Sequence, residues 1–342
     1  MARLRLGLIG LGMAVTPHAK SLVDLKDRVE VAYAFSPSEA RRKALGARFP
    51  FPPSDRLETI LNDKSVSAVM VLTPPNTHLD IVRRCAAAGK HVLLEKPLEV
   101  STARGVELVD ACRSAGVTLG VVLQHRFRPA GMKLAAMTQD GELGSIVGCS
   151  TVIRLWRPQK YYDEPGRGTK ARDGGGVLLT QGIHTLDLML SLAGPITEVR
   201  GFATTTPVHR METEDMVCAA VRYANGAYGT IDATTAAYPG FPERIEIIGT
   251  RATASLAGTE LKVARHDGTA VAVTPDTGGG GTGADPMDFP HDYHRGVLAD
   301  FLDAVEYRRS PKVSGQEALK VHRLIDALLV AGASGRPVSV AT

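Results

Sequence analysis

The sequence predicts an α/β protein of two domains: a doubly wound parallel sheet over residues 1–123, then an α+β domain with a large, mainly antiparallel open sheet over residues 124–342. In the first third, short apolar runs alternate with helical patterns, which is typical of parallel strands joined by helices. A turn with two glycines follows the first of these runs. Later apolar runs follow one another with turn residues between them, which favours antiparallel strands.

Composition and charge define the broad class of protein. Hydrophobic residues make up 44% of the 342 residues and charged residues 22%, as in ordinary globular proteins. The net charge of +4 includes no basic run, so we expect no nucleic-acid partner. No apolar run is long enough to span a membrane, so we expect no membrane partner. The widely spaced cysteines indicate reduced thiols in the cytoplasm and no metal site.

The first turn has the pattern of a dinucleotide-binding fold. A predicted strand at residues 4–9 leads to Gly10 and Gly12, and a predicted helix follows at about residues 17–25. The first glycine suits a tight turn, and the second lets a pyrophosphate approach the backbone. Val15 stands where the third glycine of the fingerprint is expected. The pattern therefore predicts a Rossmann domain.

The second predicted strand, residues 29–35, ends at Ser36. NAD-preferring folds usually have an acidic residue here to hold the ribose hydroxyls. Ser36 with Arg41 and Arg42 one turn on instead favours the 2′-phosphate of NADP. The alternative is that Ser36 serves as the N-cap of the next helix, with Glu39 reaching back to it.

Two further strands end in polar residues at the same edge of the sheet. Residues 66–72 lead into the Thr-Pro-Pro-Asn-Thr-His segment 73–78, and residues 91–94 lead into Glu95, Lys96 and Pro97. Ligands of open α/β sheets bind at the carboxyl ends of the strands. The residues alone also allow an ordinary solvated ion pair at the end of the second strand.

The second domain is predicted from turn signals and strand patterns. Asn225-Gly226 indicates a hairpin, and residues 277–285 a mobile glycine-rich loop. The predicted strands are 145–157, 199–205, 216–223, 227–235, 245–248 and 261–265, and the predicted helices are 129–139, 185–192, 294–308 and 316–333.

One stretch of the second domain has the composition of a substrate site. Three glycines at 174–176 allow a ligand to approach the backbone, and His184 falls near the start of a helix. A lone histidine is also consistent with a packed or capping role. Upstream, Trp156 next to Arg157, a tyrosine pair at 161–162 and Arg167 suggest a loop that faces a sugar.

Together these motifs resemble the Gfo/Idh/MocA family (glucose–fructose oxidoreductase, inositol dehydrogenase, rhizopine catabolism). The residues that carry the resemblance are Gly10, Gly12, His18, the segment 73–78 and Glu95-Lys96-Pro97. The resemblance extends over essentially the whole chain. In that family the lysine that matches Lys96 touches both nicotinamide and substrate, and the histidine that matches His184 flanks the reacting carbon.

The chain departs from the family's pattern at one position. Thr180, with Gln181 beside it, stands where the family commonly has an aspartate, so a relay that includes an aspartate is not assigned. Asp187 lies one turn further, where packing against a basic neighbour is the favoured interpretation. The resemblance therefore implies an acid–base pair of Lys96 and His184 and leaves open which of the two takes the proton.

The resemblance implies an NAD(P)-dependent oxidoreductase that moves a hydride between nicotinamide and a carbinol or carbonyl carbon of a sugar, polyol or sugar derivative. NADP is the expected cofactor, with NAD as the alternative, and a homodimer or homotetramer is expected. The expected cofactor residues are Gly10, Gly12, Met13, Ala14, Ser36, Arg41, Arg42, Thr73, Pro74, Asn76, His78, Glu95 and Lys96. The expected substrate residues are Lys96, Arg126, Trp156, Arg157, Tyr161, Arg167, Thr180, Gln181 and His184. Two alternatives are a non-catalytic sugar sensor that binds the cofactor and a dihydrodiol-type dehydrogenase.

Overall fold

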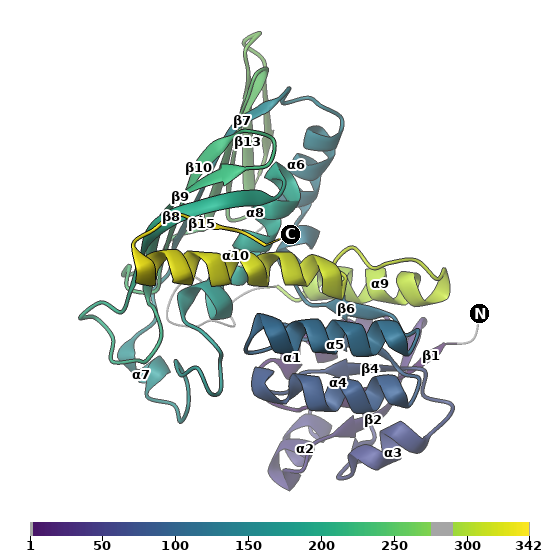
Figure 1. Ribbon diagram of the computed structural model, residues 1–342. Coiled ribbons are helices and arrows are strands. Elements are labelled where there is room, and N and C mark those ends of the chain that lie inside the picture. Colours follow the sequence, from purple (N-terminus) through teal and green to yellow (C-terminus); the bar gives the residue numbers. More distant parts are fainter. Residues whose placement is uncertain (1–2, 275–289, 342) are drawn as a thin grey trace. The chain divides into compact units, whose positions relative to one another are not determined.

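A computed structural model describes residues 3–274 and 290–341, so the predicted loop 277–285 lies outside the described residues. The chain divides into two compact units (Figure 1). The first contains Met1–Gln124 and His291–Leu319, and the second contains His125–Pro290 and Lys320–Thr342. No helix among the described residues has the length and apolar character needed to cross a bilayer.

The first unit contains a six-stranded sheet in the order β3-β2-β1-β4-β5-β6, and every pairing is parallel. The strands are β1 (Leu4–Ile9), β2 (Val29–Phe35), β3 (Pro53–Ser54), β4 (Ala68–Val71), β5 (His91–Leu94) and β6 (Leu119–Val121). The helices are α1 (Val15–Asp24), α2 (Glu39–Gly46), α3 (Leu57–Asn62), α4 (His78–Ala87) and α5 (Thr102–Ser114), with a 3-10 turn η1 (Pro75–Thr77). The predicted doubly wound sheet is confirmed.

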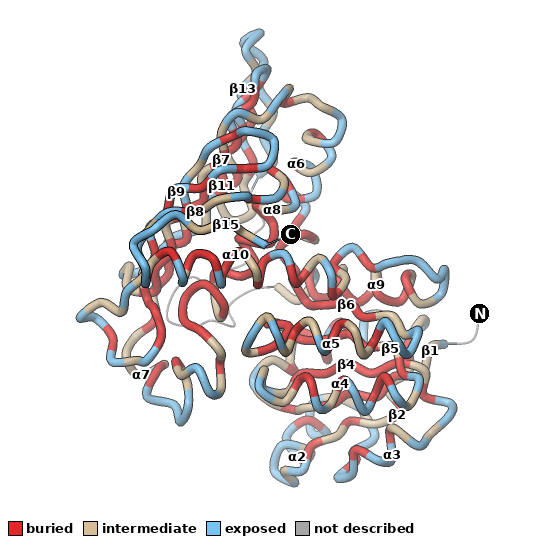
Figure 2. The backbone as a smooth tube through the Cα atoms, viewed as in Figure 1, coloured by how far each residue is buried: buried red, intermediate tan, exposed pale blue. Residues whose placement is uncertain are grey.

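Burial explains why this sheet is parallel and where it binds ligands. Every residue of β4 is buried, as expected for a central strand covered by helices on both faces (Figure 2). The strand order reverses between β1 and β4, because β2 lies on one side of β1 and β5 on the far side of β4. Such a switch point opens a crevice at the carboxyl ends of the strands.

The segment His291–Leu319 returns to the first unit, which differs from the predicted second domain of residues 124–342. Its helix α9 (Asp292–Glu306) packs against α1, and the backbone N–H of Val121 donates to the carbonyl oxygen of Val313. Phe301 of α9 is buried beneath Gly120 of β6. The apolar face of α9 therefore completes the core of the first unit.

The second unit contains a nine-stranded sheet in the order β14-β13-β12-β11-β7-β10-β9-β8-β15. Its pairings are antiparallel except that β10 pairs in parallel with β7, so the predicted mainly antiparallel sheet is confirmed. The strands are β7 (Ile146–Arg154), β8 (Ile196–Thr204), β9 (Met216–Tyr223), β10 (Tyr228–Thr234), β11 (Arg244–Gly249), β12 (Ala252–Ala257), β13 (Glu260–Arg265), β14 (Ala270–Val273) and β15 (Val338–Ser339). The predicted hairpin at Asn225-Gly226 joins β9 to β10.

Helices α6 (Pro129–Gln139) and α8 (Ile183–Ala193) pack against this sheet. Residues of β9 alternate between buried and exposed, so the opposite face of the sheet is open. α7 (Gln159–Tyr162), a 3-10 turn η2 (Gln124–Phe127) and a π-helical turn η3 (Leu178–Gly182) lie in the connections. α10 (Gly315–Ser334) begins in the first unit and continues into the second. The strands β12 and β14 were not predicted, because their short, alanine-rich sequences carry a weak strand signal.

Candidate active site

The turn after β1 has the geometry that a dinucleotide requires. Gly10 has φ +94°, and a Cβ at this position would lie 2.9 Å from backbone and side-chain atoms of Leu72 and Thr73. Around Gly12 the structure has open space, with nothing within 4 Å of a Cβ. Helix α1 then begins at Val15 with no acidic residue in its first turn. A glycine is needed at the first position and a free approach exists at the second, so the turn fits a pyrophosphate.

The end of β2 differs from the capping arrangement considered from the sequence. Helix α2 begins at Glu39, and its N-cap is Ser38, whose Oγ accepts the backbone N–H of Arg41 at 3.4 Å. Ser36 is therefore not the N-cap: it lies two residues earlier, and its Oγ accepts the backbone N–H of Ser38 at 3.2 Å. The guanidinium of Arg42 donates to the carbonyl oxygen of Ser36 at 2.6 Å, whereas Arg41 is exposed. The fold thus brings Arg42 to the end of β2.

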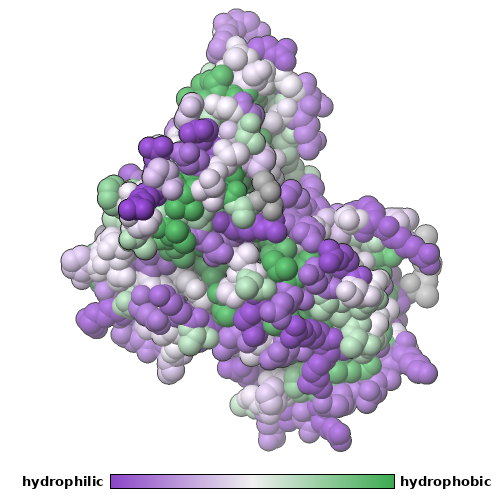
Figure 3. Space-filling view, viewed as in Figure 1, coloured by the Kyte–Doolittle hydropathy of each residue, from purple (hydrophilic) through white to green (hydrophobic). Residues whose placement is uncertain are grey.

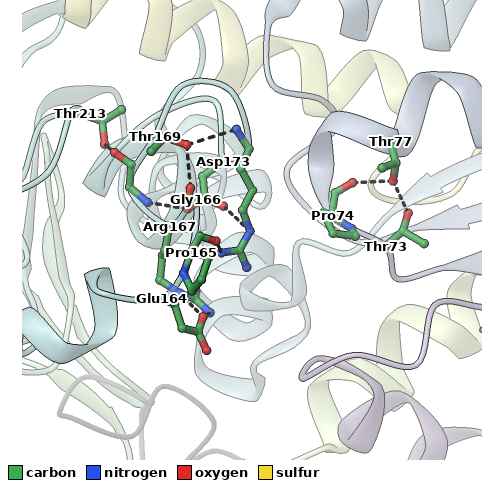
Figure 4. A network of polar contacts seen from close by, with 12 residues as sticks. Thr73, Pro74, Thr77, Glu164, Pro165, Gly166, Arg167, Thr169, Asp173 and Thr213 are labelled. Carbon is green, nitrogen blue, oxygen red and sulfur yellow. Dashed lines mark hydrogen bonds and ion pairs between the residues drawn. The ribbon is translucent and has the colours of Figure 1, made fainter. Parts of the chain in front are cut away.

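The segment after β4 is ordered by its own polar residues (Figure 4). The hydroxyl of Thr77 lies 2.8 Å from that of Thr73 and donates to the carbonyl oxygen of Pro74 at 2.7 Å. His78 is fully buried, with Nε2 2.8 Å from the carbonyl oxygen of Thr73 and Nδ1 3.1 Å from that of Pro97. Burial lowers the pKa of His78. Its ring therefore joins two strand ends, and the exposed residues of this turn are Pro74 and Asn76.

Lys96 follows β5 at the same edge of the sheet. Its backbone N–H donates to Oε2 of Glu95 at 2.5 Å, and the other carboxylate oxygen lies 3.1 Å from Nε2 of His18 on α1. Glu95 is buried, whereas Lys96 is half-buried. The carboxylate thus holds the backbone from which the lysine side chain departs.

In the second unit, a buried carboxylate holds the start of the helix that carries His184. Oε2 and Oε1 of Glu214 accept the backbone N–H groups of Gly176 and Leu178, each at 3.1 Å. A Cβ at Gly176 would collide with the carbonyl oxygen of Glu214, so only glycine fits. Desolvation raises the pKa of Glu214 despite these hydrogen bonds. The Glu214 carboxylate therefore holds the backbone from which the π-helical turn η3 and then α8 continue.

His184 lies in the first turn of α8 and is 8% exposed. Its ring centroid is 5.0 Å from that of His125. One turn further, Asp187 forms a bidentate ion pair with Arg126, with hydrogen bonds of 2.7 Å and 2.6 Å. The structure thus agrees with the interpretation that Asp187 packs against a basic neighbour. That neighbour is Arg126, which the sequence analysis places among the substrate residues.

Four of the expected substrate residues form one chain of polar contacts. The hydroxyl of Thr180 contacts Gln181, whose Nε2 donates to the hydroxyl of Tyr161 at 3.4 Å. Arg167 donates to the same hydroxyl at 2.8 Å, and its guanidinium lies 4.2 Å from the centroid of the Tyr161 ring. Glu164 accepts from Arg167 at the outer end of the chain (Figure 4). The structure therefore brings these four residues together, with the guanidinium of Arg167 over the ring of Tyr161.

Trp156 and Arg157 lie against a buried pair that sequence reasoning missed. His209 and Asp215 are fully buried, with Nδ1 of the ring 2.7 Å from Oδ2 of the carboxylate. Nε2 of His209 lies 2.7 Å from the carbonyl oxygen of Arg157, and the ring of Trp156 meets that of Tyr238 edge-on at 5.5 Å. The only sequence signal was that His209 and Asp215 precede the strongly alternating strand β9.

Comparisons with known proteins identify relatives of both parts of the chain. Residues 4–123 match the model of the oxidoreductase family with an NAD-binding Rossmann fold, and residues 132–255 match the GFO/IDH/MocA C-terminal domain. The D-xylose 1-dehydrogenase (NADP(+)) 2 of Haloferax volcanii is 27% identical over 347 residues, covering 98% of both chains. The inositol 2-dehydrogenase of Rhizobium meliloti is 25% identical over 350 residues, covering 98% of this chain and 99% of that protein.

A solved structure extends the likeness to three dimensions. The WlbA dehydrogenase of Bordetella pertussis, in complex with NADH and UDP-GlcNAcA, has a TM-score of 0.85 and 26% identity, with 100% of both chains covered. The two family models together match more than half of the chain, with one match in each unit, and the two relatives are named as dehydrogenases of a sugar and of a polyol. The chain therefore belongs to the GFO/IDH/MocA family of NAD-binding oxidoreductases.

Proposed function

We propose that this oxidoreductase is an NAD(P)-dependent dehydrogenase of a sugar, polyol or sugar derivative, in which Lys96 and His184 form the acid–base pair. The observation that carries the proposal is the placement of Lys96. It stands at the carboxyl end of β5, next to the switch point of a dinucleotide-type sheet, and its backbone is held by Glu95. The second unit supplies His184 from a helix whose start is fixed by Glu214.

The chemistry requires one proton to move as the hydride moves. A nicotinamide cofactor, when bound, would supply hydride transfer to and from the carbinol or carbonyl carbon. One of Lys96 and His184 takes the hydroxyl proton in oxidation and returns it in reduction, while the other polarises the oxygen, which is general acid–base catalysis.

The chain of polar contacts in the second unit supports the proposal that the substrate is rich in hydroxyl groups. The hydroxyl of Tyr161 accepts from Arg167 and Gln181, and Gln181 in turn contacts the hydroxyl of Thr180, so several polar groups are gathered here. The WlbA relative, crystallised with UDP-GlcNAcA, is consistent with this class. We therefore propose a sugar or a nucleotide-linked sugar as the molecule that contacts this chain of residues.

For the cofactor, the proposal is a preference for NADP over NAD. No acidic side chain stands at the end of β2, and Arg42 is bonded to the carbonyl oxygen of Ser36. A guanidinium at this place can pair with a 2′-phosphate. The relative from Haloferax volcanii is named as an NADP(+) enzyme.

We also propose that a second copy of the chain covers the open face of the nine-stranded sheet. Phe202 is 76% exposed, Tyr228 66% and Ile248 50%, and apolar surface is visible over this sheet in Figure 3. Apolar patches that remain exposed on a sheet usually mark an interface. Light scattering should give a dimer or tetramer mass, and Phe202→Asp should lower it. A wild-type monomer mass would contradict this.

The thiols support a reducing compartment, which we propose is the cytoplasm. All four cysteines are free, and three of them are buried. Burial raises the pKa of Cys85 and of Cys112 to about 12, so these thiols are protonated and inert.

The experiment that tests the proposed function is an assay of a substrate panel with both cofactors. Pentoses, hexoses, inositols, nucleotide sugars and dihydrodiols are each followed by the absorbance of the reduced cofactor. We expect turnover on a hydroxyl-bearing sugar or polyol, and loss of about 10²–10⁴ in kcat in Lys96→Ala with the affinity for cofactor within about tenfold. Cofactor and sugar binding without turnover would instead identify a sensor.

A further inference from the structure

The turn that carries Lys96 is attached to a buried cluster of side chains from three separate elements. These are His18 of α1, Glu95 after β5 and His294 of α9, which are 2%, 8% and 3% exposed. One nitrogen or oxygen atom of each lies within 4.8 Å of the others. Among the described residues, no other group of three histidine, cysteine or acidic side chains is as closely gathered.

The hydrogen bonds of Glu95 show how this cluster is organised. Nε2 of His18 donates to Oε1 at 3.1 Å, and the backbone N–H of Lys96 donates to Oε2 at 2.5 Å. Both carboxylate oxygens therefore accept a donor. Burial alone would raise the pKa of Glu95, but the hydrogen bond and charge of His18, with smaller effects of Lys96 and His294, hold it below its usual value.

His294 supports the cluster from the other side. Burial, followed by the charge of His18, lowers the pKa of His294 to about 3, so its ring is neutral at ordinary pH. It meets the ring of His18 edge-on, with centroids 4.9 Å apart and an interplanar angle of 88°. Helix α1 is also bonded to the residue before α9, because the hydroxyl of Ser21 donates to the carbonyl oxygen of His291 at 3.3 Å. His18 is therefore held in one place by packing.

We propose that His18 is a positioning residue for Lys96 and acts through Glu95, an inference that rests on the catalytic role proposed for Lys96. His18 holds the carboxylate in one rotamer, and that carboxylate holds the backbone N–H of Lys96. The direction in which the lysine side chain leaves the sheet follows from this backbone. A displacement of a reacting group by about 1 Å can lower a rate by roughly 10²-fold, so the effect on catalysis is large although His18 does not touch the substrate.

The test compares two substitutions of His18 with a control on the same helix. His18→Leu removes the donor to Glu95, whereas His18→Gln keeps an N–H that can reach the same oxygen. Ser21→Ala is the matched control, because Ser21 is equally buried in the α1–α9 contact but bonds only to the carbonyl oxygens of Pro17 and His291. Thermal unfolding, the cofactor Kd, KM and kcat are measured for each protein.

We expect His18→Leu to lower kcat by about 10²-fold while KM and the cofactor Kd change by less than about threefold. His18→Gln should restore kcat to within about tenfold of the wild type, and Ser21→Ala should keep a kcat near the wild-type value. If His18→Leu does not fold, Glu95→Gln takes its place, with the same loss of kcat expected.

Three outcomes would overturn the inference. One is a kcat for His18→Gln as low as that for His18→Leu, since the hydrogen bond would then not be the cause. Another is a loss that His18→Leu and Ser21→Ala share equally, which would indicate only weakened packing. The third is a kcat for His18→Leu near that of the wild type. Lys96→Ala, measured alongside, distinguishes failure of the catalytic role of Lys96 from failure of the positioning role of His18. A near-normal kcat in Lys96→Ala refutes the proposed function itself, whereas loss there with none in His18→Leu refutes only the role of His18.

Discussion

Arg126 and Asp187 face each other with two hydrogen bonds of 2.7 Å and 2.6 Å, and their side chains are only 9% and 1% exposed. Asp187 lies one turn after His184 on α8. The ion pair therefore joins the helix that carries His184 to the η2 turn that contains Arg126. A buried, bidentate pair of this kind holds its helix in one orientation as long as both partners are present.

The first prediction concerns this pair. Asp187→Asn removes the carboxylate charge that faces the buried guanidinium of Arg126, so the free energy of unfolding should fall by about 3–5 kcal/mol in urea titrations. The matched control is Asp232→Asn, which removes the partner of Arg154 in a pair with side chains 28% and 54% exposed. That change should lower the free energy of unfolding by less than about 1 kcal/mol. Equal losses in the two variants would show that burial of the first pair is unimportant.

The second prediction concerns His184. His184→Ala should lower kcat by about 10²–10⁴-fold while KM for the substrate changes much less. The reason is that the imidazole ring is proposed to act on the transition state and not to bind the ground-state substrate. Steady-state kinetics on the best substrate of the panel measures both constants. His125→Ala is the comparison, since His125 packs beside the ring at 5.0 Å without an assigned chemical role. A change in KM alone would make His184 a binding residue.

The third prediction concerns the cofactor. A charge-assisted hydrogen bond contributes roughly 1.5–3 kcal/mol, so Arg42→Ala should weaken NADP binding by about tenfold to a hundredfold and leave NAD binding unchanged. Lys43→Ala is the control, because Lys43 lies on the same helix with its side chain 77% exposed. Ser36→Asp should weaken NADP binding and improve NAD binding, because the new carboxylate repels a 2′-phosphate and can hold the ribose hydroxyls. Equal Michaelis constants of the wild type for both cofactors would contradict the preference.

The fourth prediction concerns stability at low pH. Burial lowers the pKa of His322 on α10 from 6.5 to about 4, so the folded protein favours the neutral ring. The unfolded chain then binds a proton that the folded chain does not, between about pH 6.5 and pH 4. The contribution is fully present above pH 6.5 and is lost as the pH falls through this window, by up to about 1.4 kcal/mol per pH unit.

His322→Leu should flatten this part of the stability curve, measured by urea unfolding from pH 7.5 to pH 4. The exposed His266 provides the control, since His266→Leu should leave the slope unchanged. A slope as steep in His322→Leu as in the wild type would place the titrating group elsewhere.

Local sequence by itself determined the elements and the edge at which ligands bind. The bounds of β1, β2, α6 and β9 agree with the ranges expected from apolar periodicity and turn residues. The polar residues at the ends of β4 and β5 lie at one edge of the sheet, as parallel strands require. These features follow from backbone preferences and side-chain period, which act over a few residues and can therefore be recognised in the sequence.

Only the tertiary structure decided which side chains meet. His294 lies close to His18 and Glu95 because α9 belongs to the first unit. No local sequence pattern predicts that the segment containing α9 packs there. Asp187 and Arg126 pair because α8 and the η2 turn pack together. Ser38 rather than Ser36 caps α2 because of the path that the chain takes after β2. The partner of a buried charge depends on which surfaces of distant elements come into contact, and this is a property of packing rather than of neighbouring residues.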